Sequence, residues 1–416
     1  MTGQVHQNEK YVLLVGDGMA DYPLPQLGHK TPLEVAHTPH MDRIAACRVG
    51  LARTVPRGMP PGSDVANLSL LGYDPLAYHT GRAPFEAASM GVDLTPEEVA
   101  FRMNLITLDR RSDQEMVMIS HSSGDLSTED ALPLVETLQQ ALATPFIRIH
   151  AGVAYRHLLV WKDGPEASRT IPPHDVLDQN MAPYLNGDPP DPVVDLIRRS
   201  WPFLTDHPVN QEREQLGLKA ANSIWLWGQG RALQIPSFQD RFGLTGGGIS
   251  AVDLLRGIGV YAGLTPIRVE GATGYLDTNY AGKAEEALKA LDGLDFVFVH
   301  VEAPDEASHN GNIEAKIEAI EAVDEKVLGR LLKGLEHFDH YRILVASDHF
   351  TPIVKKTHTD DPTPFAWATK EELALAPEPS SRREGGGARF TEEFASASGL
   401  YLDKGHELMP IFLGRA

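Results

Sequence analysis

The sequence of 416 residues contains a single cysteine, Cys47. One cysteine cannot form a disulfide within the chain, and the absence of disulfides is typical of proteins from a reducing compartment. Cys47 ends a stretch that begins at Met41 and has a helical pattern, so we expect a small buried side chain there rather than a nucleophile. The cysteine content therefore favours a cytoplasmic protein.

Long apolar runs and basic runs are also missing. No apolar stretch approaches the roughly 20 residues that a membrane-spanning helix needs, and residues 1–9 lack the apolar segment of a signal peptide and are expected to be disordered. The formal net charge is -20, and no Lys/Arg run indicates a nucleic-acid surface. We expect no membrane, no nucleic acid and no obligate protein partner. Metal ions and a few arginines can still attract an anionic small molecule to an acidic protein.

The length of the chain predicts two domains, because a single core stops growing below this size. Short strand candidates at 116–119, 146–149 and 157–161 lie among helical stretches and precede a loop-rich passage at 186–192. We therefore expect a core made of residues 1–84 and 236–416, with residues 85–235 inserted as a smaller α+β domain. Further strands are expected at 223–227 and 267–269, a helix at 250–257, and a surface loop around residues 385–387.

Three apolar runs predict the centre of the core. Residues 11–15, 296–301 and 342–346 are apolar almost without interruption, as in strands buried on both faces of a parallel sheet. Between the last two, apolar residues recur from 313 to 332 with the spacing of a helix that buries one stripe. Strand, helix, strand is a βαβ unit, and the fold class is α/β with a parallel sheet flanked by helices.

Acids and histidines follow each of these three strands. The carboxyl ends of parallel strands share one edge of the sheet, where ligands bind, and a helical turn after the second strand would put residues four apart on one face. A lone aspartate after a strand can be a turn residue, and a lone histidine such as His300 is usually a satisfied buried side chain. Independent turn residues, however, have little reason to follow three separate strands as Gly-Asp-Gly, Asp-x-x-x-His and Asp-His. The set suits divalent ions such as Mn²⁺, Zn²⁺ or Mg²⁺; its members are Asp17, Asp305, His309, Asp348, His349 and His358.

Ser63 is the candidate nucleophile. It precedes the helix-like run 65–71 at a position typical of an N-cap, and it could be a capping serine and nothing more. The same position also suits catalysis, because a helix N-terminus stabilises an alkoxide or a phosphoserine, and a nearby metal ion would lower the pKa of the hydroxyl further.

Several motifs together resemble the archaeal-type branch of the cofactor-independent phosphoglycerate mutases, in the alkaline-phosphatase superfamily. The resemblance covers nearly the whole chain. The motifs that carry it are Gly16-Asp-Gly-Met19 and residues 28–34, 38–42, 61–64, 71–75, 80–86, 155–157, 302–309 and 347–349. It implies an alkaline-phosphatase-like core with an inserted substrate domain, two divalent ions with Mn²⁺ as the first choice, and a phosphoserine intermediate.

The resemblance also implies roles for single residues. One ion would be held by Asp305, His309 and His358, and the other by Asp17, Ser63, Asp348 and His349. Basic side chains would bind the anionic groups of a small phosphorylated substrate, since the fork of arginine matches phosphate and carboxylate. The candidates are Arg82, Arg156, Arg231 and Lys283, with His121 as a proton carrier or phosphate donor.

The implied activity is interconversion of 3- and 2-phosphoglycerate, but two features leave the acceptor of the phosphoryl group open. Phe350 stands where a small residue or proline is expected, and segments 224–231 and 271–279 resemble a bacterial subgroup proposed to contain homoserine kinases. A homoserine kinase-like transferase and a metal-dependent phosphatase are therefore alternatives, although no Walker-type loop is present. A metal-stabilised binding protein fits less well, because structural sites normally close their coordination shell with protein groups.

Overall fold

The computed structural model describes residues 8–187, 191–376 and 387–415. It divides into two compact units, Met1–His79 with Gln234–Ala416, and Thr80–Leu233. These boundaries differ by a few residues from the expected 85 and 235. The expectations for the N-terminus and for the loop at 385–387 fall largely outside the described residues. Within the described part of the chain, no helix is both long enough and apolar enough to cross a membrane.

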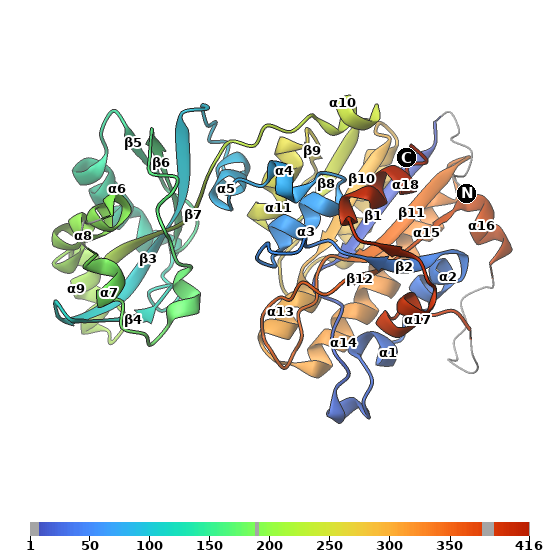
Figure 1. Cartoon of the computed structure of the whole chain (residues 1–416), viewed down its shortest axis with the longest axis horizontal. Coiled ribbons are helices and arrows are strands. Elements are labelled where there is room, and N and C mark those ends of the chain that lie inside the picture. The colour runs from blue at the N-terminus through green and yellow to red at the C-terminus, as the bar shows by residue number, and fades with distance from the viewer. Residues whose placement is uncertain (1–7, 188–190, 377–386, 416) are drawn as a thin grey trace. The chain divides into compact units, whose positions relative to one another are not determined.

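The larger unit is built on an eight-stranded, mostly parallel sheet (Figure 1). The strand order is β13-β2-β12-β11-β1-β10-β8-β9, and only the β11–β12 and β12–β2 pairs are antiparallel. The strands are β1 (Lys10–Gly16), β2 (Val49–Ala52), β8 (Gly246–Ile249), β9 (Thr265–Pro266), β10 (Phe296–Val301), β11 (Tyr341–Ser347), β12 (Thr363–Thr369) and β13 (Tyr401–Leu402).

The centre of this sheet confirms the predicted α/β fold class. β1 lies between β10 and β11 and is parallel to both. Its apolar residues are buried on alternate faces: Val12 and Leu14 pack into the main core cluster, and Tyr11 faces the other way and contacts Phe412, with ring centroids 5.9 Å apart. Because both faces are covered, the strand has no polar face, and this explains its continuous apolar run.

Helices cover this sheet on both faces. Their bounds are α1 (Pro32–Val35), α2 (Pro39–Cys47), α3 (Ser63–Leu70), α4 (Pro75–Tyr78), α10 (Phe238–Phe242), α11 (Asp253–Tyr261), α12 (Tyr280–Leu291), α13 (Ala303–His309), α14 (Ile313–Ala322), α15 (Gly329–Leu335), α16 (Lys370–Leu375), α17 (Glu392–Ala397) and α18 (Leu408–Phe412). The predicted helix at 313–332 is α14, a π-helical segment Val323–Leu328, and α15 in succession. The buried carboxylate of Asp324 in the π segment accepts hydrogen bonds from the backbone N–H groups of His40 and Met41, at the start of α2.

Three local features of this unit differ from what the sequence indicated: one helix starts later than expected, one predicted strand is absent, and one strand was not predicted. The helix expected at 250–257 is α11, which begins at Asp253, and residues 267–269 form no strand; the short strand β9 precedes them. The strand β8 was not predicted, because three of its four residues are glycines. A Cβ at Gly246 would lie 2.6 Å from a side-chain carbon of Leu264, and one at Gly247 would lie 2.6 Å from a side-chain carbon of Ile267. The close approach of neighbouring side chains, rather than strand propensity, therefore accounts for the glycines in β8.

The smaller unit is an antiparallel sheet with helices packed against it. Its long strand β3 (Glu98–Ser112) pairs with three strands, β4 (Glu115–Ser120), β6 (Arg156–Lys162) and β7 (Ser223–Arg231), and β5 (Ile147–His150) pairs with β6. The strands expected at 116–119, 146–149, 157–161 and 223–227 are confirmed, but β3 was missed because charged residues interrupt its apolar pattern. The helices are α5 (Ala83–Ser89), α6 (Thr128–Leu142), α7 (Ala182–Leu185), α8 (Pro192–Thr205) and α9 (Pro208–Gln215).

Candidate active site

Asp17 lies directly after β1, where the chain turns sharply. Its backbone N–H donates to the carbonyl of Val301 at 2.9 Å, so the ends of β1 and β10 are fixed side by side. Gly18 follows with φ +59°, and a Cβ there would lie 2.5 Å from Thr351 Oγ1 and 2.7 Å from Asp305 Oδ1. Only glycine lets the backbone pass this close to the acidic cluster.

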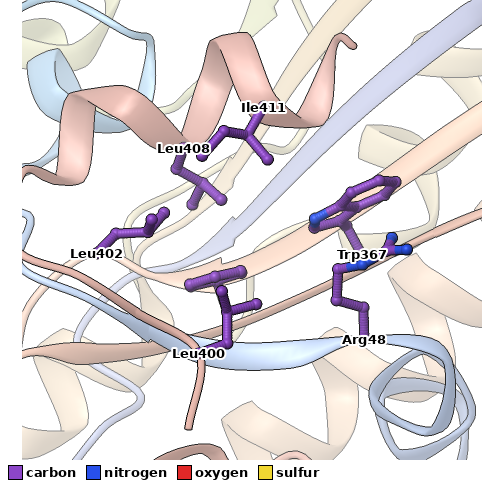
Figure 2. A pocket seen from close by; sticks show the side chains of 7 residues that line it. Arg48, Trp367, Leu400, Leu402, Leu408 and Ile411 are labelled. Atoms are coloured by element: carbon purple, nitrogen blue, oxygen red, sulfur yellow. The ribbon is translucent and has the colours of Figure 1, made fainter. Parts of the chain in front are cut away.

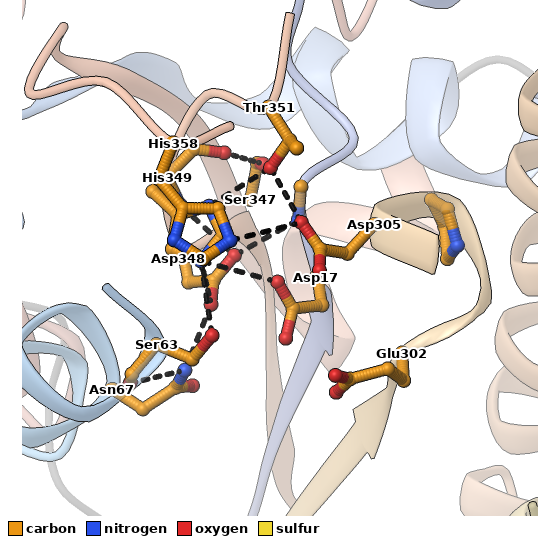
Figure 3. A network of polar contacts seen from close by, with 12 residues as sticks. Asp17, Ser63, Asn67, Glu302, Asp305, Ser347, Asp348, His349, Thr351 and His358 are labelled. Atoms are coloured by element: carbon orange, nitrogen blue, oxygen red, sulfur yellow. Dashed lines mark hydrogen bonds and ion pairs between the residues drawn. The ribbon is translucent and has the colours of Figure 1, made fainter. Parts of the chain in front are cut away.

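Asp348 and His349 follow β11 at the same edge and are fully buried. The carboxylate of Asp348 accepts hydrogen bonds from the backbone N–H groups of Gly18 at 3.0 Å and His349 at 2.9 Å, and from Asn67 Nδ2 at 2.8 Å (Figure 3). This carboxylate therefore joins the turn after β1 to helix α3.

Asp305, His309 and His358 form one compact group of possible metal ligands. Asp305 and His309 lie one turn apart on α13, as their spacing predicted, with His309 Nε2 3.0 Å from Asp305 Oδ2. His358 reaches the group from the loop before β12, with its Nε2 3.4 Å from Asp305 Oδ1 and 3.1 Å from His309 Nε2. One carboxylate and two imidazoles converging in this way suit a divalent transition metal ion.

Asp17 takes part in two further groups, Asp17–His300–Asp348 and Asp17–Asp305–His349. His300 is a residue that the sequence interpretation set aside as a lone histidine. It is completely buried, and its Nε2 lies 2.8 Å from Asp17 Oδ2. Its place in β10, one residue before the strand ends, was the available signal, because it puts His300 at the same edge of the sheet as Asp17.

Ser63 lies close to His349, with 3.1 Å between Oγ and Nε2. The prediction that Ser63 is the N-cap of the helix is wrong: Gly62 is the N-cap, in an extended conformation, and Ser63 is the first helical residue. The hydroxyl is thus free of a capping bond. Asn67, one turn further along α3, donates to the Ser63 carbonyl at 2.9 Å as well as to Asp348 (Figure 3). The serine is therefore held against the acidic cluster.

Thr351 is a second residue that sequence reasoning missed. Its Oγ1 donates to Asp305 Oδ1 at 2.6 Å and lies 3.1 Å from His349 Nδ1 (Figure 3). Its carbonyl accepts from the buried Nζ of Lys316 at 3.1 Å, and Lys316 also forms an ion pair of 2.8 Å with Asp21. Thr351 thus orients an aspartate and a histidine from different elements, and a buried ion pair fixes its own backbone.

The shifted pKa values of the buried carboxyl groups in this cluster are typical of a site that binds cations. Burial, reinforced by the neighbouring Asp348, raises the pKa of Asp17 well above its usual value, and burial raises the pKa of Glu302 to about 8 and that of Asp348 to about 6. Burial also acts to raise the pKa of Asp305, but hydrogen bonds with His309 and His358 outweigh it and hold this pKa well below its usual value. Asp17 Oδ1 and Glu302 Oε2 are buried without a hydrogen-bond partner. Carboxylates gathered in this way are stable as anions only beside positive charge, so these residues fit divalent metal ions.

A cluster of basic and aromatic side chains lies in the smaller unit. His121 and Arg156 both adjoin Tyr155, with ring centroids of His121 and Tyr155 5.8 Å apart and Arg156 Cζ 5.8 Å from the same ring. Arg102 Cζ lies 4.1 Å from the Trp227 ring. Burial lowers the pKa of Arg102 to about 10, and the charges of Arg82 and Arg156 lower it too. The structure therefore brings together three predicted residues, Arg82, His121 and Arg156, and adds Arg102, which the sequence analysis missed.

Comparison with known proteins identifies the family of this chain. A family model described as 2,3-bisphosphoglycerate-independent phosphoglycerate mutase matches residues 45–210, and one described as type I phosphodiesterase / nucleotide pyrophosphatase matches residues 152–377. A probable 2,3-bisphosphoglycerate-independent phosphoglycerate mutase from Geobacter sulfurreducens is 49% identical over 408 residues, which cover 98% of this chain and 100% of that protein. The chain belongs to the 2,3-bisphosphoglycerate-independent phosphoglycerate mutase family.

Another relative and two solved structures support this assignment. The mutase from Methanosarcina acetivorans is 52% identical over 361 residues, 86% of this chain and 90% of that protein. Among solved structures, a protein from Pyrococcus horikoshii superposes with a TM-score of 0.77 at 29% identity, covering 98% of both chains. The cofactor-independent phosphoglycerate mutase from Thermoplasma acidophilum superposes with a TM-score of 0.60 at 25% identity, covering 97% of this chain and 99% of the other. The predicted family and its alkaline-phosphatase-like fold are confirmed.

The two remaining basic residues that the family resemblance suggested, Arg231 and Lys283, have partners of their own. Arg231, at the end of β7, forms an ion pair of 2.7 Å with Glu166 and donates to the carbonyl of Pro96 at 2.8 Å. Lys283 belongs to the larger unit, where it is completely buried on α12 and donates from Nζ to the carbonyl of His300 at 2.8 Å. Burial lowers the pKa of Lys283 to about 8. Arg231 and Lys283 therefore each already bind another group of the protein.

Proposed function

We propose that this protein interconverts 3-phosphoglycerate and 2-phosphoglycerate through a phosphoserine formed at Ser63, without 2,3-bisphosphoglycerate. Relatives of about the same length that are named for this reaction support the overall activity. The observation that carries the chemical step is the place of the Ser63 hydroxyl, 3.1 Å from His349 beside a buried cluster of carboxylates and imidazoles. A serine that only capped its helix would have no reason to face these groups.

The residues of the cluster would hold two divalent ions, with Mn²⁺ as the first choice and Zn²⁺ or Mg²⁺ as alternatives. Asp305, His309 and His358 would hold one ion. The other would be held by Asp17, Ser63, Asp348 and His349. When bound, such ions lower the pKa of a serine hydroxyl and offset the negative charge of a phosphoryl group.

The side chains of the protein then position the reacting groups. Ser63 Oγ loses its proton and attacks the phosphorus of 3-phosphoglycerate, the bond between phosphorus and the substrate's 3-oxygen breaks, and that oxygen gains a proton to give glycerate. In the second step the 2-hydroxyl of glycerate attacks the phosphoserine, loses its proton, and restores the Ser63 hydroxyl. Ser63 begins α3, where backbone N–H groups favour the negative charge that develops in both steps.

The smaller unit supplies fixed positive charge for the substrate in this proposal. Arg82, Arg156 and His121 bind its carboxylate and phosphate, and the Nε of Arg82 is a buried donor without a hydrogen-bond partner. Arg231 and Lys283 are weaker candidates, because each would have to exchange its present partner. We also propose that the enzyme acts in the cytoplasm, as its cysteine content suggests.

The test follows the phosphoryl group. Purified protein with Mn²⁺ and 3-phosphoglycerate, without bisphosphoglycerate or nucleotide, is expected to form 2-phosphoglycerate with little free phosphate, as monitored by phosphorus NMR. Accumulation of inorganic phosphate would instead identify a phosphatase. Inactivity toward both phosphoglycerates, together with formation of phosphohomoserine from ATP and homoserine, would overturn the mutase proposal.

Ser63→Ala tests the phosphoserine separately. The variant is expected to lose turnover while remaining folded, because it removes one hydrogen-bonding hydroxyl, worth about 1 kcal/mol. Ser69→Ala is the matched control, since Ser69 lies on the same helix and its buried hydroxyl has no hydrogen-bond partner. Retention of most of the turnover by Ser63→Ala would place the nucleophile elsewhere.

A further inference from the structure

A cavity of about 180 Å³ lies between strand β12 and helix α18 in the larger unit (Figure 2). It shares none of its lining residues with the candidate active site. Most of its wall is apolar, made by side chains around β13, on α18 and on β12: Leu400, Leu402, Leu408, Ile411 and Phe365. An apolar cavity of this kind favours an apolar occupant over water, which needs several polar partners to stay in place.

Two nitrogen atoms in the wall have unused hydrogen-bonding capacity. Trp367 is only 3% exposed, and its Nε1 is buried without a hydrogen-bond partner. In Figure 2 the nitrogen-bearing edge of the indole points toward Leu402 and Leu408, into the cavity. A buried N–H donor without an acceptor is unfavourable, so the indole is expected to gain from any acceptor that enters.

Arg48 places a positive charge on the face of the same indole. Its guanidinium stacks on the Trp367 ring, with Cζ 3.7 Å from the centroid. One guanidinium nitrogen, Nη2, forms an ion pair of 3.0 Å with Glu372, whereas the other, Nη1, is buried without a hydrogen-bond partner. The wall of the cavity therefore offers an indole N–H, and the guanidinium stacked on the same indole has one nitrogen without a partner. An anionic acceptor matches this pair better than a neutral one.

The size of the cavity limits the ligand to about one ring. An apolar cavity of about 150 Å³ holds benzene, and pockets for drug-sized molecules begin at about 300 Å³. We propose that this cavity is a binding site for a small aryl carboxylate. The ring packs against the leucine side chains, and a carboxylate oxygen accepts from Trp367 Nε1 beside the guanidinium of Arg48.

The experiment uses the full-length protein with ¹⁵N-labelled tryptophan and three probes: phenylacetate, toluene and acetate. The chain has five tryptophans, and Trp367→Phe assigns the indole signal that belongs to the cavity. Phenylacetate is expected to shift the Trp367 N–H signal at concentrations at which toluene and acetate do not. The proposal fails if phenylacetate moves this signal no more than acetate does, or if toluene binds as tightly as phenylacetate, since the cavity would then be apolar packing space only.

Variants distinguish the contribution of the Trp367 indole N–H from that of the apolar volume of the cavity. By calorimetry, Trp367→Phe is expected to weaken phenylacetate binding about tenfold or more, because it removes the donor and retains an aromatic ring. The control Trp201→Phe, in the smaller unit, should leave the affinity unchanged. Equal phenylacetate affinity in wild type and Trp367→Phe would overturn the proposed role of the indole. If Trp367→Phe folds poorly, Phe substitutions of the other four tryptophans assign the Trp367 signal by elimination, and the comparison of probes on the wild-type protein still decides the proposal.

Discussion

Glu302 provides a quantitative test of the view that the acidic cluster is built for cations. Its Oε2 has no hydrogen-bond partner and lies 3.7 Å from His300 Nε2. Burial and the charges of Asp305, Glu306 and Asp348 raise the pKa of Glu302, whereas Asp17 acts in the opposite direction through a hydrogen bond. In the metal-free protein this carboxylate is repelled by its neighbours and deprived of water. We predict that Glu302→Gln stabilises the metal-free protein at pH 8.

The size and the pH dependence of this effect follow from the pKa of Glu302. Burial, followed by the charge of Asp305, raises this pKa from 4.5 to about 8, which corresponds to at most about 5 kcal/mol for the ionised form. Because the side chain is 14% exposed, water reduces this cost, and we expect about 2–4 kcal/mol. The destabilisation is absent below pH 4.5, where the carboxyl group is protonated in both folded and unfolded chains. It grows as the pH rises and is complete above about pH 8.

The assay is denaturant unfolding with a chelator present, at pH 5 and at pH 8. Labelling with fluorotryptophan isolates the larger unit, since Trp367 is its one tryptophan. Glu302→Gln should raise the free energy of unfolding at pH 8 and have little effect at pH 5, whereas the exposed Glu318→Gln, on α14, should have little effect at either pH. Added Mn²⁺ should stabilise the wild type. If the Gln variant were no more stable than the wild type at pH 8 without metal, the electrostatic argument would be refuted.

Three further outcomes are expected. Thr351→Val removes the hydroxyl that bonds Asp305, so metal affinity measured by calorimetry should fall roughly 10–100-fold, with Thr351→Ser retaining it; equal affinity in the Val variant would contradict this role. Lys316→Met leaves the Asp21 carboxylate buried and unpaired, and should lower the free energy of unfolding by about 3–5 kcal/mol in a urea titration; a change within error would mean that the pair adds no stability. Arg156→Gln should raise KM for 3-phosphoglycerate at least tenfold with unchanged metal affinity, and an unchanged KM would remove this side chain from the substrate site.

The central strands were predictable because burial on both faces leaves a strong signal. β1, β10 and β11 are continuous apolar runs, and the acids that follow them converge because parallel strands end at one edge. The spacing of Asp305 and His309 also indicated one helical turn, as α13 confirms. These predictions depend on local pattern and sheet geometry alone.

The missed residues depend on contacts between distant segments. His300 looks like part of an apolar strand, and its meaning comes from Asp17, which is 283 positions away in the chain. Thr351 has no distinctive motif, and its importance lies in the two side chains that it joins. Ser63 was placed in the correct turn but at the wrong helical position, since the extended conformation of Gly62 decides where α3 begins.

The same reasoning shows where the identity of the substrate is encoded. Nucleophile and metal ligands of this kind serve phosphoryl transfer in general, so they do not distinguish glycerate from another acceptor. The basic cluster can distinguish them. Arg102 forms an ion pair of 2.8 Å with Glu86, whereas the Nε of Arg82 has no partner. A substrate with both a carboxylate and a phosphate would satisfy such unpaired donors. Homoserine carries an ammonium group besides its carboxylate and has no net charge, so a cluster of positive charges would attract it less than phosphoglycerate. If these residues bind the substrate, as proposed, the charge around Tyr155 would favour phosphoglycerate over homoserine.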